Sequence, residues 1–171
     1  MSLGKNQRIG LIAFFILFLD QLTKQIVLRN LVFLRDEYVV IDGFFKFVHW
    51  GNTGAAWSVL SGNNEMLAII SLVALLLLFF YRDYFDTRSF MGQTALGLIF
   101  GGITGNLIDR LFVKHVIDFL RFYLYQRGGT EIGFPAFNVA DAAICTGVGL
   151  LFLLSRQTEQ NRRMETAPER P

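Results

Sequence analysis

Two acidic residues near the C-terminal end of an otherwise apolar chain have the types and setting for hydrolytic chemistry. Asp118 lies in the segment VIDF (116–119), and Asp141 closes the segment FNVAD (137–141). A carboxylate beside lipid costs several kcal/mol unless it is paired, hydrated or protonated. Two carboxyl groups placed side by side cannot both stay ionised, so they share a proton. Such a pair can activate water without a metal ion or a nucleophilic side chain.

The composition indicates a membrane protein with several spans. Of the 171 residues 53% are hydrophobic and 18% are charged, whereas a soluble domain has about 45–50% and about 25%. The net charge of +2 and the lack of a basic stripe argue against a nucleic-acid partner.

The residues that most often bind metals are scarce. Cys145 is the single cysteine, so no intrachain disulfide or thiolate metal cluster is possible, and we expect it to be a small core residue. His49 and His115 lie far apart, and neither belongs to a His-Glu-x-x-His helix. A metalloprotease is therefore disfavoured, and we expect no metal and no cofactor.

Four hydrophobic segments are each close to the ~20 residues needed to cross a bilayer. They cover about 9–27, 66–81, 94–113 and 139–155, and the second is expected to face lipid. The predicted fold class is membrane all-α, a four-transmembrane-helix bundle with a small extracytoplasmic β-rich surface segment. Residues 1–155 would form one membrane-embedded domain, and 156–171 a polar, disordered cytoplasmic tail.

The two long connections differ from the short polar one at 82–93. Residues 38–50 are rich in β-branched and aromatic residues around Asp42-Gly43, which predicts a hairpin or small sheet within a β-rich segment of about 38–60. Residues 114–137 mix Arg, Phe and Tyr, as an interfacial loop does. Basic residues at both ends and in the short connection favour cytoplasmic termini, with the two acids at the outer face.

Polar residues recur near the ends of the first and third spans. Asp20 and Lys24 are spaced for a helical ion pair, which is either self-neutralised at the interface or part of a polar cleft. Glycines at every fourth position from 97 to 105 predict close helix packing. Packing does not explain Asn106, Asp109 and Arg110, for which we expect a hydrogen-bond network under the acids.

Two further motifs have structural and functional interpretations. Asn52 and Gly54 open the segment NTGAAW (52–57), which is either an ordinary turn or a place where a substrate backbone approaches closely. Asn138 and Asp141 have the spacing of a helix N-cap and its partner, a capping box that would explain both residues without chemistry.

Five ordered motifs of this chain resemble those of the lipoprotein signal peptidases, also called type II signal peptidases. They are DQLTK (20–24), NTGAAW (52–57), GGITGNLIDR (101–110), VIDF (116–119) and FNVAD (137–141). The length and the four-span layout agree. Trp57 stands where the family more often has Phe, a conservative difference.

The resemblance implies an aspartic endopeptidase of the bacterial inner membrane, with Asp118 and Asp141 as the catalytic pair at the outer face. Its substrate would be a diacylglyceryl-modified prolipoprotein cut just before the lipidated cysteine, and globomycin would inhibit it. We expect a monomer in contact with membrane lipid. The residues that would contact substrate or support the site are Asp20, Lys24, Asn52, Gly54, Asn106, Asp109, Arg110 and Asn138.

The residues alone leave two other classes open. A small transporter could use intramembrane acids as proton carriers, although it would place them near the middle of the bilayer. A non-enzymatic scaffold could use the glycine stripe as a partner interface. Flux across vesicles and cleavage of a precursor by the purified protein distinguish these classes from a peptidase.

Overall fold

The structure is a computed structural model that describes residues 3–54, 62–85 and 87–165. Trp57 and the end of the expected β-rich segment, 55–60, lie outside the described residues.

Four helices are long and apolar enough to cross a membrane, as the hydrophobic segments predict. The helices cover the predicted spans to within one residue, and each is longer than its span at one or both ends. The helices are α1 (Lys5–Asn30), α2 (Asn64–Tyr81), α3 (Phe90–Phe112) and α4 (Val139–Glu165), and a 3₁₀ turn, η2 (Arg82–Tyr84), follows α2.

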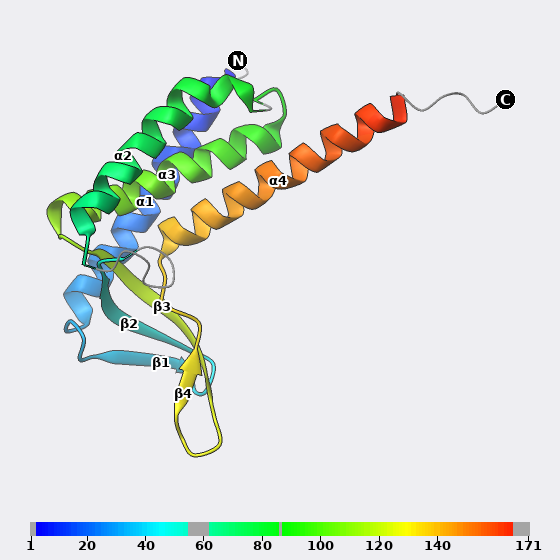
Figure 1. Cartoon of the computed structure of the whole chain (residues 1–171). Coiled ribbons are helices and arrows are strands. Elements are labelled where there is room, and N and C mark those ends of the chain that lie inside the picture. Colours follow the sequence, from blue (N-terminus) through cyan, green and yellow to red (C-terminus); the bar gives the residue numbers. More distant parts are fainter. Residues whose placement is uncertain (1–2, 55–61, 86, 166–171) are drawn as a thin grey trace.

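Helix α3 is the centre of the bundle and packs against the other three helices (Figure 1). Its glycines allow this because a methyl group on Gly101 would lie 2.6 Å from the Ala13 carbonyl oxygen of α1. On the neighbouring face, a methyl group on Gly102 would lie 2.5 Å from the Ala140 carbonyl oxygen of α4. The predicted close packing along the glycine stripe is confirmed, and α3 holds both neighbours at backbone distance.

Helix α2 contributes little to this core. Most of its large apolar side chains are exposed, among them Ile69, Leu77 and Phe80 at 63%, 53% and 70%. In a membrane-spanning helix such a surface faces lipid, which agrees with the expectation for this segment.

A small antiparallel sheet lies beyond one end of the bundle (Figure 1), with strands in the order β1-β2-β3-β4. Strands β1 (Glu37–Ile41) and β2 (Phe45–Asn52) form the predicted hairpin, and Gly43 in its turn has a φ of +70°. Strands β3 (Val116–Tyr125) and β4 (Glu131–Gly133) come from the segment that was predicted to be an interfacial loop. This segment is therefore not simply a loop, because β3 pairs with β2, and Asp118 lies on a strand opposite Trp50. Its interfacial position stays a prediction.

The opposite end of the bundle holds the start of α1, the α2–α3 connection and the far end of α4 (Figure 1). An ion pair of 2.8 Å joins Lys5 of α1 to Asp83 of η2. Both ends of the described chain therefore lie on the side away from the sheet.

Two expectations for α4 are wrong. Residues 156–165 are helical rather than disordered, because this polar stretch contains Arg, Gln and Glu and no glycine or proline. Cys145 is exposed rather than in the core. On an exposed face of a membrane-spanning helix, the apolar bilayer accommodates a thiol as readily as a protein core does.

Candidate active site

Asp118 is held near the start of β3 with only 3% of its surface exposed. Its two carboxylate oxygens accept hydrogen bonds from the side-chain amides of Asn138 at 2.9 Å and Asn52 at 3.1 Å. Burial raises the pKa of the Asp118 carboxyl to about 7, and the nearby charge of Asp141 adds to the rise. Asp118 is thus suited to hold a proton at neutral pH.

Asp141 lies in the first turn of α4 and forms the capping box that its spacing predicts. Its backbone N–H donates to Asn138 Oδ1 at 2.8 Å, and the Asn138 backbone N–H donates to its carboxylate at 3.3 Å. The other carboxylate oxygen accepts a hydrogen bond of 2.7 Å from the Asn106 side chain. The cap fixes the carboxylate at the helix N-terminus, where its charge is favourable.

Asn138 joins the two acids into one site. It is fully buried, caps α4 beside Asp141, and with the same side chain donates to Asp118. Asn106 Oδ1 accepts a bond of 3.2 Å from Asn138, and the Asn106 amide donates to Asp141. The structural interpretation of the capping motif is therefore correct without excluding the chemical one.

A buried cation lies beneath the acids. Lys24 Nζ is 2.8 Å from Asp20, 2.7 Å from Asp109 and 3.0 Å from Asn106 Oδ1. The predicted Asp20–Lys24 ion pair is present, but it is buried inside the bundle rather than exposed at the interface. We call Lys24, Asp20, Asp109 and Asn106 the Lys24 cluster.

The Lys24 cluster positions the segments that carry the two acids. Asp20 accepts a hydrogen bond of 2.9 Å from the Ala140 backbone N–H, next to Asp141. Asp109 accepts one of 3.1 Å from the Ile117 backbone N–H, next to Asp118. One buried lysine thus links the start of α4 to the start of β3.

Arg110 and the β2 end form the other wall of the site. Arg110 donates to the Gly54 carbonyl oxygen at 3.2 Å, and Asn52 Oδ1 accepts a bond of 2.9 Å from the Gly54 backbone N–H. Among the described residues, the buried Nε of Arg110 has no hydrogen-bond partner. Every residue that the motifs predicted for the site belongs to this one connected network, including the expected network of Asn106, Asp109 and Arg110.

Gln21 is a member of the network that the sequence did not predict. Gln21 donates to Asp109 at 3.1 Å and to the Gly105 carbonyl oxygen at 3.3 Å, so it ties α1 to α3. Its place inside the DQLTK motif was the available signal. Among the described residues, no group of three or more His, Cys, Asp or Glu side chains could hold a metal ion.

Comparison with known proteins identifies the family. A family model for signal peptidase (SPase) II matches residues 12–156. The lipoprotein signal peptidase of Bacillus pumilus is 39% identical, with 84% of this chain and 88% of that protein aligned. The corresponding protein of Nostoc punctiforme is 40% identical, with 90% and 92% aligned.

Solved structures agree. A bacterial membrane enzyme determined by the in meso method at 2.3 Å resolution has a TM-score of 0.76 and 31% identity, with 94% of this chain and 92% of that chain covered. Together these matches define a multi-pass membrane protein that is an aspartic peptidase. The chain belongs to the signal peptidase II family, and it removes signal peptides from prolipoproteins in lipoprotein maturation. The family resemblance seen in the motifs is confirmed.

Proposed function

We propose that Asp118 and Asp141 are the catalytic pair of this peptidase. The observation that carries the proposal is Asn138, whose single buried side chain hydrogen-bonds Asp118 while capping the helix turn that holds Asp141. Two carboxyl groups in one buried site favour a state with one shared proton. That state supplies an acid and a base together, which is what hydrolysis of a peptide bond needs.

The burial of the two acids suggests how the roles divide. Asp118 is almost fully buried and its pKa is raised to about 7, which favours Asp118 as the holder of the shared proton in the free enzyme. Asp141 is more accessible and, as the carboxylate, takes a proton from the attacking water. Protonated Asp118 gives its proton to the scissile carbonyl oxygen as the carbonyl becomes a tetrahedral diol. As the diol collapses, Asp141 passes the proton it took from water to the leaving amine, the C–N bond breaks, and a diol hydroxyl returns a proton to Asp118.

The surrounding polar groups stabilise that intermediate. Asn138 and Asn106 keep the two carboxyl groups oriented through bonds that exist before substrate arrives. The unpartnered Nε of Arg110 supplies a donor for the diol or for the substrate backbone beside Gly54. Lys24, Asp20 and Asp109 act one step further away, by positioning the two backbone segments.

The substrate we propose is a prolipoprotein whose cysteine carries diacylglycerol, cleaved just before that cysteine. Asp118 lies near the start of β3 and Asp141 in the first turn of α4, and both elements start at the end of the bundle next to the sheet (Figure 1). We place the surface of the bilayer at this level. Two acyl chains anchor a residue at that depth far better than one. Lipidation therefore places the scissile bond at the level of the acids.

We further propose the bacterial inner membrane as the location, with the sheet and the acids at the outer face. Lys5 and Arg8 at the start of α1, and Arg82 and Arg88 in the α2–α3 connection, support cytoplasmic placement of that end by the positive-inside rule. Residues 1–155 form one membrane-embedded peptidase domain that acts as a monomer among membrane lipids, and 156–171 form a polar cytoplasmic tail.

A defined cleavage assay tests the proposed function. The purified protein is incubated with a synthetic lipobox peptide carrying diacylglyceryl-cysteine, and with the same peptide lacking lipid. Mass spectrometry should locate cleavage before the lipidated cysteine only, and globomycin should block it. Cleavage at another bond, or equal cleavage of the unlipidated peptide, contradicts the proposed specificity.

Single variants in the same assay test the catalytic pair. Asp141→Asn should lose activity on the order of thousands-fold, since the two acids act as one unit. Asp83→Asn is a matched control, because Asp83 is an acid paired with a lysine at the opposite end of the bundle. Comparable loss in both variants would indicate general damage rather than a catalytic role for Asp141.

A further inference from the structure

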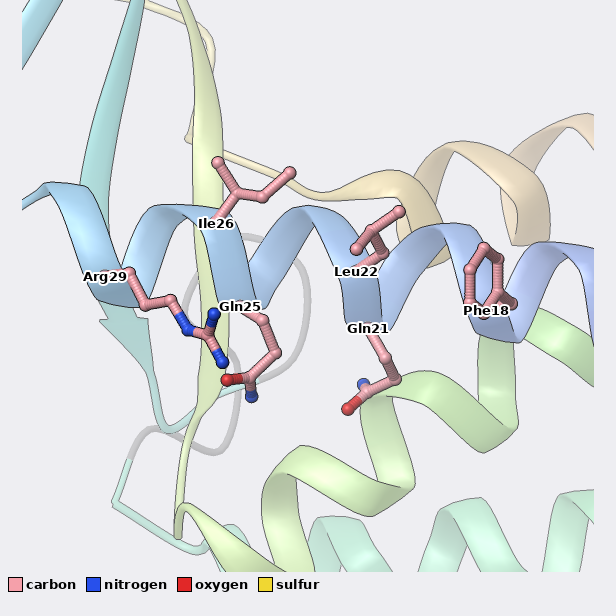
Figure 2. A pocket seen from close by; sticks show the side chains of 6 residues that line it. All are labelled: Phe18, Gln21, Leu22, Gln25, Ile26 and Arg29. Atoms are coloured by element: carbon pink, nitrogen blue, oxygen red, sulfur yellow. The ribbon is translucent and has the colours of Figure 1, made fainter.

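The outer face of α1 carries two parallel rows of side chains, of which only Gln21 belongs to the network of the peptidase site. Phe18, Leu22 and Ile26 form an apolar row at four-residue intervals. Gln21, Gln25 and Arg29 form a polar row beside it, and both rows line one groove of about 330 Å³ (Figure 2).

The side chains that line the groove change from charged to polar to apolar with increasing depth in the membrane. Arg29 lies in the last turn of α1, next to the sheet. With the bilayer surface at the sheet end of the bundle, as proposed above, Arg29 lies at the level of the lipid headgroups. Gln25 lies about 6 Å deeper and Phe18 about 16 Å deeper, at 1.5 Å per helical residue. A phospholipid has the same order of groups, with a phosphate outermost, ester carbonyls below it and acyl chains below those.

Two of these polar side chains are open to a partner from outside the chain. Gln25 and Arg29 are exposed, and within the described part of the chain neither has a hydrogen-bond or ion-pair partner. Water at the surface can hydrate Arg29, but Gln25 is a turn deeper, where an unpaired amide is costly. Gln21, the deepest of the row, is already bonded to Asp109 and to the Gly105 carbonyl oxygen.

The apolar row offers the complementary surface for acyl chains. Phe18, Leu22 and Ile26 are 54%, 44% and 53% exposed, so they extend an open apolar strip toward the bilayer centre. A guanidinium binds phosphate through two parallel N–H groups, and an amide N–H₂ donates to an ester carbonyl. Charge and polarity thus match a lipid from headgroup to chain.

We propose that this groove is a binding site for one glycerophospholipid. Arg29 binds the phosphate, Gln25 donates to an ester carbonyl, and one acyl chain lies along Phe18, Leu22 and Ile26. The diacylglyceryl group of a substrate has no phosphate, which makes a phospholipid the better fit. The inference does not rest on the proposed catalytic pair.

Native mass spectrometry of the delipidated full chain in detergent tests this site. The probes are phosphatidylglycerol and a diacylglycerol with the same acyl chains. We expect one retained phosphatidylglycerol per chain and much weaker retention of the diacylglycerol. Arg29→Gln should weaken phosphatidylglycerol binding on the order of tenfold, because it removes a charge-assisted hydrogen bond.

Matched variants keep the test specific. Arg35→Gln removes another exposed arginine that does not line the groove, and it should bind phosphatidylglycerol like the wild type. Gln25→Leu should weaken binding by a few-fold, whereas Gln160→Leu on the polar end of α4 should not. Asp141→Asn should bind the lipid normally even though it is expected to be inactive.

Three outcomes would overturn the proposal. Equal loss in Arg29→Gln and Arg35→Gln would indicate non-specific attraction to basic residues. Equal retention of both lipids, unaffected by Arg29→Gln, would indicate a groove that holds acyl chains alone. Unchanged binding in both groove variants would place any lipid elsewhere. Retained peptide cleavage by Arg29→Gln confirms that this variant is folded, and Arg29→Lys, which keeps the charge, should recover part of the binding.

Discussion

Two lysines in this molecule are each held between two acids, but in different surroundings. Lys24 lies in the bundle, and the side chains of Lys24, Asp20 and Asp109 are no more than 2% exposed. Lys46 lies in the sheet with its side chain 3% exposed, while those of its partners Glu37 and Glu131 are 41% and 32% exposed. We call Lys46, Glu37 and Glu131 the Lys46 cluster.

The difference in burial shows that one lysine between two acids can have two roles, which are to link strands or to position an active site. The acids of the Lys46 cluster reach water. This cluster therefore links β1 and β4 to the centre of the sheet, and its acids stay hydrated if the ion pairs break. The acids of the Lys24 cluster cannot be hydrated, so each depends on Lys24 for compensation. Asp109 and Asp20 also accept backbone hydrogen bonds beside Asp118 and Asp141, and these bonds set the geometry of the site.

Lys24→Met should give the largest effect of the substitutions that probe this contrast. It leaves Asp20 and Asp109 buried without a counter-charge, so we expect the free energy of unfolding to fall by about 3–5 kcal/mol. Peptide cleavage should fall as well, because both acid-bearing segments lose their anchor. Denaturant unfolding in detergent measures the first effect, and a variant of wild-type stability would show that the cluster is hydrated.

Gly102→Ala probes the close contact that places Asp141. Its methyl group would lie 2.5 Å from the Ala140 carbonyl oxygen and push the start of α4 away, at a cost of about 1–3 kcal/mol. Cleavage should fall more steeply than stability, since Asp141 moves with that turn. Gly149→Ala in α4 is the control, because its methyl group would meet no atom within 4 Å. Equal effects of both variants would contradict the role given to this contact.

The two acids of the active site and the Lys46 cluster differ in their expected response to pH. The proposed mechanism needs protonated Asp118, whose pKa is about 7, so activity should fall about tenfold per unit as pH rises above that value. It also needs ionised Asp141, so activity should fall again at low pH, where Asp141 takes up a proton. Burial alone would lower the pKa of Lys46, but the hydrogen bonds that Lys46 donates to Glu131 and Glu37 raise it above its usual value. The stability contributed by the Lys46 cluster is therefore present below the usual lysine pKa and is lost only as pH rises through the raised one.

A pH–rate profile with parallel circular dichroism tests whether activity and the stability of the sheet respond differently to pH. Activity should decline across neutral pH while the sheet signal stays constant. A flat rate between about pH 6 and 9 would show that Asp118 does not supply the proton.

Lys46→Met should have the smallest effect. Glu37 and Glu131 can turn to water once the lysine is gone, so we expect a loss of about 1 kcal/mol and normal cleavage. The comparison with Lys24→Met uses the same substitution in both places. Losses of equal size would remove the distinction between the two clusters.

Features of the fold that depend on local sequence were predictable. The four spans follow from runs of apolar residues, and the hairpin follows from Asp42-Gly43 between β-branched stretches. Strand β3 was missed because its partner β2 is more than sixty residues away, and its aromatic and basic residues also suit a membrane interface. Cys145 was misplaced because an apolar helix in lipid does not reveal which face is buried.

For the site, the sequence predicted which residues take part but not how they are arranged. The five motifs supplied the residues of the network, but not the way in which they are bonded. Spacing alone revealed the capping box of Asn138 and Asp141, yet the bond from Asn138 to Asp118 requires β3 to lie beside α4. Gln21 was overlooked because a glutamine beside an ion pair has no distinctive spacing, and only the packing of α1 on α3 gives it partners.

The central claim is that Asp118 and Asp141 work as one unit with a shared proton. A double-mutant cycle of cleavage rates tests it most directly, with Asp118→Asn, Asp141→Asn and the combination assayed on the diacylglyceryl-cysteine peptide. If the two acids act together, each single variant loses on the order of thousands-fold and the double variant loses about the same. Losses that multiply in the double variant, or a single variant close to wild-type activity, would contradict it.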